Sequence, residues 1–428
     1  MEFINNQQSK YKIILDQTKE ENRLGMHSFH RYYGKLIPAI PRAFIREFTS
    51  EGDLVFDPFS GSGTVALEAK QANRNFVGVE INPLSVLISK IKVEEYDINI
   101  LNKIYEKIIF EAENDNEDIL DDELPFCVNR DHWFKDFVQI DLVKIQRNIQ
   151  PVINHYIKDS EEINKYFNFF NGVLSAIVKQ VSNADTMHVF PGISKRVRAL
   201  EKEGKIHINV FESYKRACKK RINYVGEVAQ NHATTKFILA NSANVDLSNY
   251  YNCVDLVVTN PPYISSVRYA ETLKLELYWM GIVKGTTEYA NLSNSMIGND
   301  HIKKENFKDK KLTKYDFINN YIEKLFEIDP KQAKVLYDFF DNMEKVIINM
   351  FNVLKRKGKL VMKISDSKIR KVKVPTGKLL TQIAEKNGFR LIDAFNDKIN
   401  ENSRSLLTAR NTYSDIILED NIIIWEKL

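Results

Sequence analysis

An amide, two prolines and an aromatic ring follow directly on an apolar strand pattern in VDLVVTNPPYISS, residues 254–266. Proline fixes its own φ and restricts the residue before it, so Pro261 and Pro262 would hold the Asn260 side chain in one orientation where the chain leaves a sheet. An amide oxygen and a rigid backbone carbonyl aimed at one point form an acceptor pair suited to a substrate amine. Tyr263 offers a flat face on which a ring could stack. The plain alternative is a strand that the prolines merely end.

A glycine-rich turn, FDPFSGSGT at residues 56–64, is the second pattern that could do chemistry. Gly61 and Gly63 would let the backbone approach a ligand closely between a strand and a helix. The spacing differs from the dinucleotide pattern G-x-G-x-x-G and from the phosphate loop of ATP-binding proteins. Glu80 ends the next strand, where a carboxylate can accept hydrogen bonds from two ribose hydroxyls. A nucleoside without a pyrophosphate is the predicted ligand, and a simple tight turn is the alternative.

The elements around these motifs predict a doubly wound α/β sheet. A strand at 53–59, a helix at 63–73 and a strand at 75–83 form a βαβ unit, which requires a parallel sheet. The segments KFILANS, VDLVVT and GKLVMKISD read as further core strands. Helical patterns follow them, such as residues 341–358, for which Gly358 is the predicted stop.

A helical insertion of more than a hundred residues interrupts this alternation. We therefore divide the chain into an N-terminal part of the catalytic domain (1–96), the insertion (97–235) and a C-terminal part (236–428). The end of the insertion is basic, and its cations either contact nucleic acid or form a solvated face: Lys195, Arg196, Arg198, Lys219, Lys220 and Arg221. The basic stretch at 301–314, expected to be a loop, has the same two interpretations.

The composition excludes several classes of protein. The chain of 428 residues, 43% of them hydrophobic, is long enough for a large α/β domain and a second module. No apolar run approaches the ~20 residues that span a bilayer, and the start MEFINNQQSKYK lacks the core of a signal peptide, so we expect a soluble cytoplasmic protein. Cys127, Cys218 and Cys253 lie far apart, which predicts neither a disulfide framework nor a metal site. A net charge of +4 is too small to indicate nucleic-acid binding by itself.

Three motifs in this order, DPFSGSGT, VGVEINP and TNPPY, resemble the S-adenosylmethionine-dependent DNA amino-methyltransferases, which modify adenine N6 or cytosine N4. FHRYYGKLIPAIPRAFI (29–45) is similar to the family's segment that closes over the methionine end of the cofactor, and LKRKGKLVMKISDS (354–367) to a later core strand. The insertion, with DHWFKDF at 131–137, is similar to that of one subgroup. The resemblance implies a methyltransferase sheet of seven strands with the last antiparallel, and residues 420–428 suit a late strand.

The resemblance also implies S-adenosylmethionine as the cofactor, double-stranded DNA as the substrate, base flipping and no metal. A cognate restriction endonuclease stays open as a further partner. The motifs and the resemblance together assign these residues to cofactor binding: Tyr33, Lys35, Pro38, Asp57, Pro58, Phe59, Gly61, Gly63, Thr64, Glu80, Asn82 and Asn241. The catalytic set is Asn260, Pro261, Pro262 and Tyr263. Asn260 Oδ1 and the Pro261 carbonyl would accept the two amine hydrogens, while Tyr263 stacks on the flipped base.

Asn260 favours adenine N6 as the target, because the cytosine-N4 enzymes usually carry Ser at this position. Cytosine N4 is the alternative, since the subgroup with the similar insertion often has the Ser form. RNA guanine-N2 methyltransferases share the glycine turn but usually add an N-terminal RNA-binding module. Protein glutamine methyltransferases share NPPYI but lack the Asp-Pro-Phe lead of residues 57–59. An inactive nucleic-acid-binding scaffold is disfavoured by the intact Asn260 and Glu80.

Overall fold

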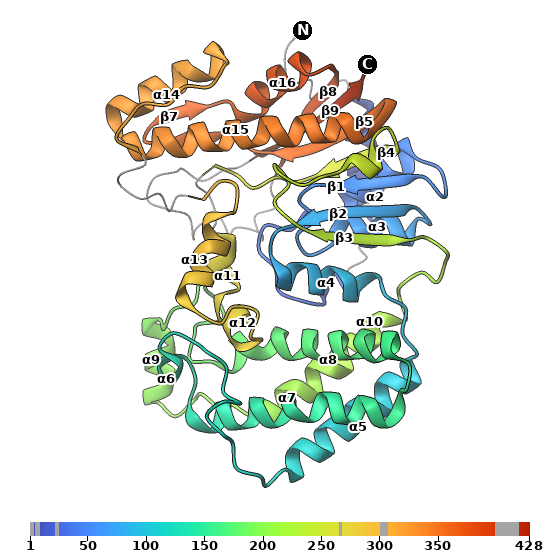
Figure 1. Cartoon of the computed structure of the whole chain (residues 1–428), viewed down its shortest axis with the longest axis vertical. Coiled ribbons are helices and arrows are strands. Elements are labelled where there is room, and N and C mark those ends of the chain that lie inside the picture. The colour runs from blue at the N-terminus through green and yellow to red at the C-terminus, as the bar shows by residue number, and fades with distance from the viewer. Residues whose placement is uncertain (1–3, 5–8, 22–24, 265–267, 300–306, 399–418) are drawn as a thin grey trace.

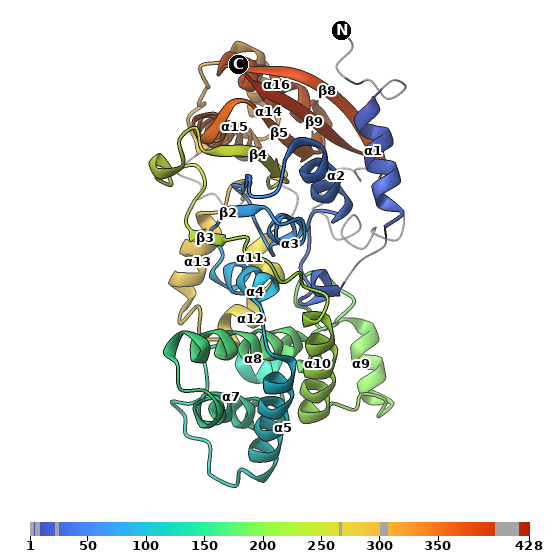
Figure 2. The same cartoon turned by 90° about the vertical axis from the view of Figure 1, so that its right-hand side faces the viewer.

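The computed structural model describes residues 4, 9–21, 25–264, 268–299, 307–398 and 419–428. A sheet domain occupies the upper part of Figure 1, and a helical module lies beneath it. Turning the molecule by 90° keeps this arrangement (Figure 2). None of the helices in the described ranges is long and apolar enough to cross a membrane.

Seven strands form one sheet in the order β3-β2-β1-β4-β5-β9-β8. The paired neighbours are parallel, except that β9 runs antiparallel to both β5 and β8. The strands are β1 (Leu54–Asp57), β2 (Asn75–Glu80), β3 (Thr235–Leu239), β4 (Val254–Thr259), β5 (Leu354–Ile364), β8 (Phe389–Lys398) and β9 (Glu419–Lys427). This confirms the predicted α/β class, the seven strands and the antiparallel last strand, which the predicted segment 420–428 forms.

Alternate side chains of the central strands enter two different cores, because successive strand residues point to opposite faces. Val55, Leu256 and Val258 belong to one core, and Phe56 and Val257 to the other. The first core is shared with α1 (Lys10–Lys19), α2 (Ala39–Phe48), α3 (Thr64–Gln71) and α4 (Pro83–Val93), and the second with α14 (Asp316–Ile328), α15 (Pro330–Val353) and α16 (Thr376–Lys386). The sheet is thus covered on both faces, as a parallel sheet requires.

The residues between α4 and β3 form the helical module. Its helices are α5 (Ile98–Asn114), α6 (Arg130–Trp133), α7 (Asp136–Tyr156), α8 (Ser160–Val181), α9 (Lys195–Lys202) and α10 (Val210–Val225). Apolar side chains of α5, α7, α8 and α10 join the core that α2, α3 and α4 also share. The module therefore extends the core of the sheet domain, and the three-part division with boundaries at 96 and 235 stays a prediction.

Helix α8 crosses α4 at a glycine. A Cβ at Gly172 would lie 2.3 Å from Ile91 Cδ1 and 3.2 Å from Phe29 Cε1. Glycine inside a helix costs roughly 0.5–1 kcal/mol relative to alanine, and this close approach explains why one is present. The insertion is pressed directly against the helix that follows β2.

The predicted helix at 341–358 is wrong at both ends. Helix α15 begins at Pro330, where the Asp329 side chain accepts from the Gln332 amide, and it ends at Val353. Gly358 lies inside β5, directly after Lys357, whose φ is 65°. The local stop signal for a helix is overridden because the following residues pair with β4 on one side and β9 on the other.

Shorter elements complete the described part of the chain. They are η1 (Gly25–Ser28), η2 (Ser248–Tyr250), α11 (Tyr269–Thr272), α12 (Lys274–Trp279), α13 (Thr286–Asn294) and a two-stranded sheet of β6 (Ser367–Ile369) and β7 (Val372–Val374). Of the basic stretch at 301–314, residues 301–306 lie outside the described ranges, and residues 308–314 form neither helix nor strand.

The strand order reverses between β1 and β4. Both strands are parallel to their neighbours, so the carboxyl ends of β1, β2 and β4 share one edge of the sheet. Doubly wound sheets bind their ligands in the crevice at such a switch point. The glycine turn after β1, Glu80 at the end of β2 and Asn260 after β4 therefore meet there.

Candidate active site

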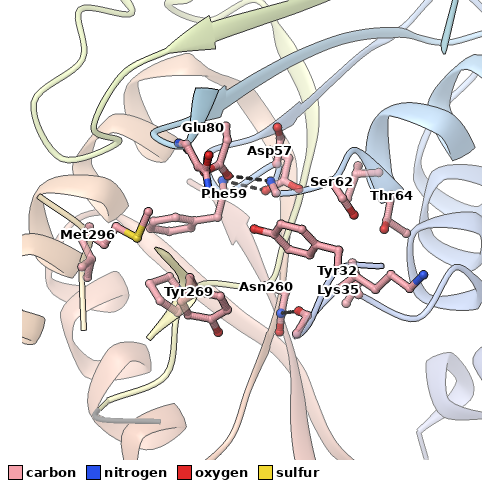
Figure 3. Close-up of a pocket in the computed structure, with 18 residues that line it drawn as sticks. Tyr32, Lys35, Asp57, Phe59, Ser62, Thr64, Glu80, Asn260, Tyr269 and Met296 are labelled. Atoms are coloured by element: carbon pink, nitrogen blue, oxygen red, sulfur yellow. Dashed lines mark hydrogen bonds between the residues drawn. The ribbon is translucent and has the colours of Figure 1, made fainter. Parts of the chain in front are cut away.

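A cavity with an open volume of about 740 Å³ lies at this edge of the sheet (Figure 3). Four parts of the chain line it: the segment before α2, the turn after β1, the end of β2 and the segments that follow β4.

The glycine turn has the backbone that the sequence predicts. Gly61 and Gly63 have φ of 51° and 76°, in the left-handed region that favours glycine. A Cβ at Gly63 would lie 2.8 Å from Ser89 Oγ. Helix α4 holds the turn from below, because Ser89 Oγ donates to the Gly61 carbonyl at 2.9 Å and Lys92 Nζ donates to the Ser62 carbonyl at 2.6 Å. The peptide groups of the turn are thereby fixed in place.

Glu80 lies beneath this turn with both carboxylate oxygens engaged. Oε2 accepts the Gly61 amide and Oε1 accepts the Asn82 amide, each at 2.8 Å. Burial raises the pKa of Glu80, and the backbone hydrogen bonds act in the opposite direction. Each carboxylate oxygen has a second lone pair, so Glu80 can accept two further hydrogen bonds from a ligand.

Asp57 ends β1 and is almost wholly buried. Its Oδ1 accepts the Phe59 amide at 2.9 Å and the Thr259 hydroxyl at 2.7 Å. Burial raises the pKa of Asp57 to about 7, against the opposing effect of these hydrogen bonds, and the nearby charge of Glu80 adds to the rise. A cation placed beside this carboxyl would favour its ionised form.

The segment before α2 closes one side of the cavity. Tyr32, Gly34, Lys35 and Leu36 all line it. A Cβ at Gly61 would lie 3.4 Å from Tyr32 Cε1, so the Tyr32 ring covers the turn. Lys35 Nζ donates to the His27 carbonyl at 2.9 Å, and burial lowers the pKa of Lys35.

Asn260 is held on this same segment. Its Nδ2 donates to the Gly34 carbonyl at 3.0 Å. Gly34 has φ of 75°, and a Cβ there would lie 3.0 Å from Tyr269 Cε1, so the acceptor carbonyl is itself confined. Because Nδ2 is committed to Gly34, the Oδ1 of Asn260 is the end of the amide that remains as an acceptor.

Tyr263 is anchored through its hydroxyl. The ring is half-buried against the core that contains α15, and its hydroxyl donates to Asp420 Oδ1 at 2.9 Å. Lys363 Nζ lies 3.4 Å from the same hydroxyl. The side chain is therefore fixed before any substrate binds, and its stacking on a base stays a prediction.

The cavity brings together most of the residues proposed from the sequence. Those that line it are Lys35, Asp57, Phe59, Gly61, Thr64, Glu80, Asn82, Asn260 and Pro262. Those that do not are Tyr33, Pro38, Pro58, Gly63, Asn241, Pro261 and Tyr263.

Several residues outside the lining have other contacts. Tyr33 donates its hydroxyl to the His188 carbonyl in the insertion at 3.1 Å, and Pro38 is the N-cap of α2. The Pro58 carbonyl accepts from the Ser242 hydroxyl. Asn241 Nδ2 donates to the Ser295 carbonyl at 2.9 Å.

Nine further lining residues were missed by the sequence analysis: Tyr32, Gly34, Leu36, Ser60, Ser62, Val65, Tyr269, Met296 and Ile297. Tyr32 stands next to the proposed Tyr33, and the doublet was the available signal. Figure 3 shows the Met296 sulfur directed toward the Phe59 ring. No motif in the sequence marks Met296, which follows α13 in the part of the chain after β4.

The six cations at the basic end of the insertion differ in their surroundings. Lys195, Arg198, Lys219 and Lys220 are exposed on α9 and α10. Arg196 pairs with Asp185 at 2.5 Å. Arg221 is half-buried and donates from Nε to the Phe29 carbonyl at 2.7 Å, which ties α10 to the segment before α2. Contact of the six cations with DNA stays a prediction.

Known proteins match this chain along most of its length. A family model described as DNA methylase matches residues 6–90, which include the glycine turn and Glu80. The type II methyltransferase M.MvaI of Kocuria varians is 24% identical over 87% of this chain and 84% of its own length. M.MjaII of Methanocaldococcus jannaschii is 22% identical over 96% of this chain and 83% of its own. Along nearly its whole length, the chain is thus similar to the S-adenosylmethionine-dependent DNA amino-methyltransferases.

Among solved structures, a SAM-dependent methyltransferase from Methanosarcina mazei aligns with 90% of this chain and 97% of its own, at 9% identity and a TM-score of 0.31. The methyltransferase fold is assigned from the strand order, in which an antiparallel last strand lies between β5 and β8. The TM-score of that solved structure is too low to support the assignment further.

The donors and acceptors of the cavity fit S-adenosylmethionine, the cofactor of this family. Glu80 offers acceptors for ribose hydroxyls, and Asp57 offers a carboxylate for a cation. Ser60 Oγ is buried and has no hydrogen-bond partner within the part of the chain that the structure describes, which leaves it available to a ligand. Phe59 and Met296 supply apolar surface for a planar base.

Cofactor binding should depend on pH through Asp57. Its pKa of about 7 means that the carboxyl is mostly protonated at pH 6 and mostly ionised at pH 7.5. Because S-adenosylmethionine carries positive charge, we expect its dissociation constant to be roughly fivefold to tenfold lower at pH 7.5 than at pH 6. Calorimetry on wild type and Asp57→Asn would measure this.

The Asp57→Asn variant should lose most of the pH dependence, while the control Asp246→Asn, at an exposed carboxyl, should keep it. An unchanged pH profile in Asp57→Asn would show that another group is responsible.

Proposed function

We propose that this enzyme transfers the methyl group of S-adenosylmethionine to the exocyclic N6 amine of adenine at a specific site in double-stranded DNA. The observation that carries the proposal is the Asn260 amide, held by the Gly34 carbonyl at the edge of the same cavity that contains Glu80 and Asp57. The relatives named type II methyltransferases support a site-specific enzyme of a restriction-modification system. A cognate endonuclease would be its partner.

The proposed chemistry requires acceptors for an amine. The lone pair of an aromatic exocyclic amine is conjugated with the ring, so the nitrogen is a poor nucleophile. Asn260 Oδ1 and the Pro261 carbonyl would accept its two hydrogens, which favours a pyramidal nitrogen and stabilises the transition state more than the ground state. S-adenosylmethionine supplies the methyl group. The segment of Tyr32 to Leu36 would cover the reacting atoms and exclude water.

The cavity also implies how the substrate enters. An amine inside a duplex cannot reach Asn260, so the target nucleotide would have to be extruded from the helix. The exposed face of Tyr263 is the proposed stacking surface, and its anchored hydroxyl would hold the ring ready for the base.

Cytosine N4 is the second candidate. The alignment with M.MjaII covers 96% of this chain and therefore spans the insertion, and the enzymes with a similar insertion often carry Ser in place of Asn260. Adenine is favoured by Asn260 itself.

Identification of the product tests the proposal. The enzyme would be incubated with labelled S-adenosylmethionine and a pool of duplex DNA, and the digested nucleosides would be separated by mass spectrometry. We expect label in N6-methyldeoxyadenosine. Label in N4-methyldeoxycytidine would establish the second candidate instead. Label in RNA or in a glutamine side chain, offered in parallel, would overturn both.

Asn260→Ala should abolish methyl transfer and leave cofactor binding nearly unchanged. The change removes the proposed amine acceptor but none of the contacts of Glu80 or the glycine turn. Turnover and cofactor affinity would be measured side by side, with Asn244→Ala, an exposed asparagine, as the matched control. Retention of more than a tenth of wild-type turnover would exclude Asn260 as the acceptor.

The exposed cations of the insertion should make DNA binding sensitive to salt. If Lys195, Arg198, Lys219 and Lys220 contact phosphates, changing two of them to Gln should reduce the slope of log K against log salt by about two, with equal weakening of all sequences. Fluorescence anisotropy over a salt series measures this. The control changes Lys103 and Lys158, exposed in and near other helices of the module. An equal slope in both double variants would show that the cations at the basic end form a solvated face and do not contact DNA.

A further inference from the structure

The Tyr263 hydroxyl has one hydrogen, and a carboxylate oxygen and an amide oxygen of the described residues lie beside it. Asp420 Oδ1 lies at 2.9 Å and Asn260 Oδ1 at 3.3 Å. A hydroxyl donates one hydrogen bond at a time. Which of the two oxygens receives the hydrogen decides whether Asn260 Oδ1 keeps its lone pairs for a substrate.

Asp420 is built to be the stronger acceptor. It lies on β9 with its side chain almost fully buried, and Lys363 Nζ on the adjacent β5 pairs with its Oδ2 at 2.5 Å. Ser365 donates its hydroxyl to Oδ1. The ammonium group of Lys363 and the hydroxyl of Ser365 thus both contact this carboxyl group.

The hydrogen of Tyr263 therefore belongs to Asp420. Hydrogen bonds to an ionised acceptor are roughly twice as strong as neutral ones, and Asp420 is also the nearer oxygen. Burial raises the pKa of Tyr263 well above its usual value, with the charge of Asp420 adding to the rise, so the phenol keeps its hydrogen. The contact of the Tyr263 hydroxyl with Asn260 Oδ1, at 3.3 Å, is then the weaker of the two.

We propose that Asp420 is a positioning residue for methyl transfer: it holds the Tyr263 hydroxyl hydrogen, so that Asn260 Oδ1 remains an acceptor for the substrate amine. The proposal rests on the proposed role of Asn260. Without Asp420, the Tyr263 hydroxyl can turn to Asn260 Oδ1 and compete with the amine for it. The residue acts on the reaction through two others, from a strand 157 positions further along the chain than the tyrosine.

A rescue experiment separates this role from a structural one. Asp420→Ala should lower kcat at least tenfold, with the KM for S-adenosylmethionine unchanged. Tyr263→Phe should lower kcat less than Asp420→Ala does, because the stacking ring remains, and its own kcat is the reference for the double variant. Adding Tyr263→Phe to Asp420→Ala should restore kcat to the level of Tyr263→Phe alone, since the competing hydroxyl is gone.

A second variant guards against poor folding of Asp420→Ala, in which Lys363 loses its partner. Asp420→Asn keeps the shape of the side chain and should show a smaller loss of kcat, also restored by Tyr263→Phe. The control is Asn260→Ala with Tyr263→Phe, which should stay inactive because the acceptor itself is missing.

The outcomes distinguish the two proposals. If Asn260→Ala abolishes turnover but Tyr263→Phe restores neither Asp420 variant, the positioning role of Asp420 is wrong and the function stands. If both Asp420 variants keep wild-type kcat, the positioning role is equally excluded. If Asn260→Ala stays active, the proposed role of Asn260 is wrong, and the role of Asp420 that rests on it is wrong as well.

Discussion

The hydrogen bond from the Thr259 hydroxyl to Asp57 Oδ1, 2.7 Å long and fully buried, joins residues that lie 202 positions apart. It crosses from β4 to β1 at the point where the strand order reverses. The glycine turn starts directly after one partner and Asn260 follows the other. The parallel pairing of β1 with β4 thus brings the cofactor-binding turn and the catalytic segment to one edge of the sheet. The insertion lies between β2 and β3 and does not interrupt that pairing.

Much of this arrangement could be predicted because its signals are local. The glycine turn, Glu80 and Asn260 each mark the end of a strand, and the ends of parallel strands must share an edge. The choice between Tyr32 and Tyr33 could not be predicted, because the two neighbours are the same residue type and only a distant contact, from the Tyr33 hydroxyl to the His188 carbonyl, separates them. Gly358 was misplaced since glycine ends helices and also occurs in strands, and only pairing with distant β9 settles the matter. Asp420 carries no motif, and its role arises from contacts over 157 positions.

The site contains more buried charge than stability alone would favour. Lys92 is fully buried beneath the glycine turn, and burial lowers its pKa well below the usual value. The pair of Lys363 and Asp420 is also buried. Desolvation of such groups costs several kcal/mol, so a buried ion pair is weak evidence for stability. Each of these buried charges holds a part of the site in place. Lys92 fixes a peptide of the glycine turn, and Asp420 fixes the Tyr263 ring beside Asn260.

The crossing of α8 over α4 has a consequence for building chimeras. A helix from a relative, transplanted with the rest of the insertion, would bring its own residue to this crossing, and any side chain there would require the buried Ile91 and Phe29 to shift. Compatibility between donor and recipient would then depend on whether these two side chains can repack, and not only on linker length or surface charge. In shuffled libraries of such enzymes, a mismatch at this crossing would be expected to cost stability, whatever DNA sequence the donor recognises.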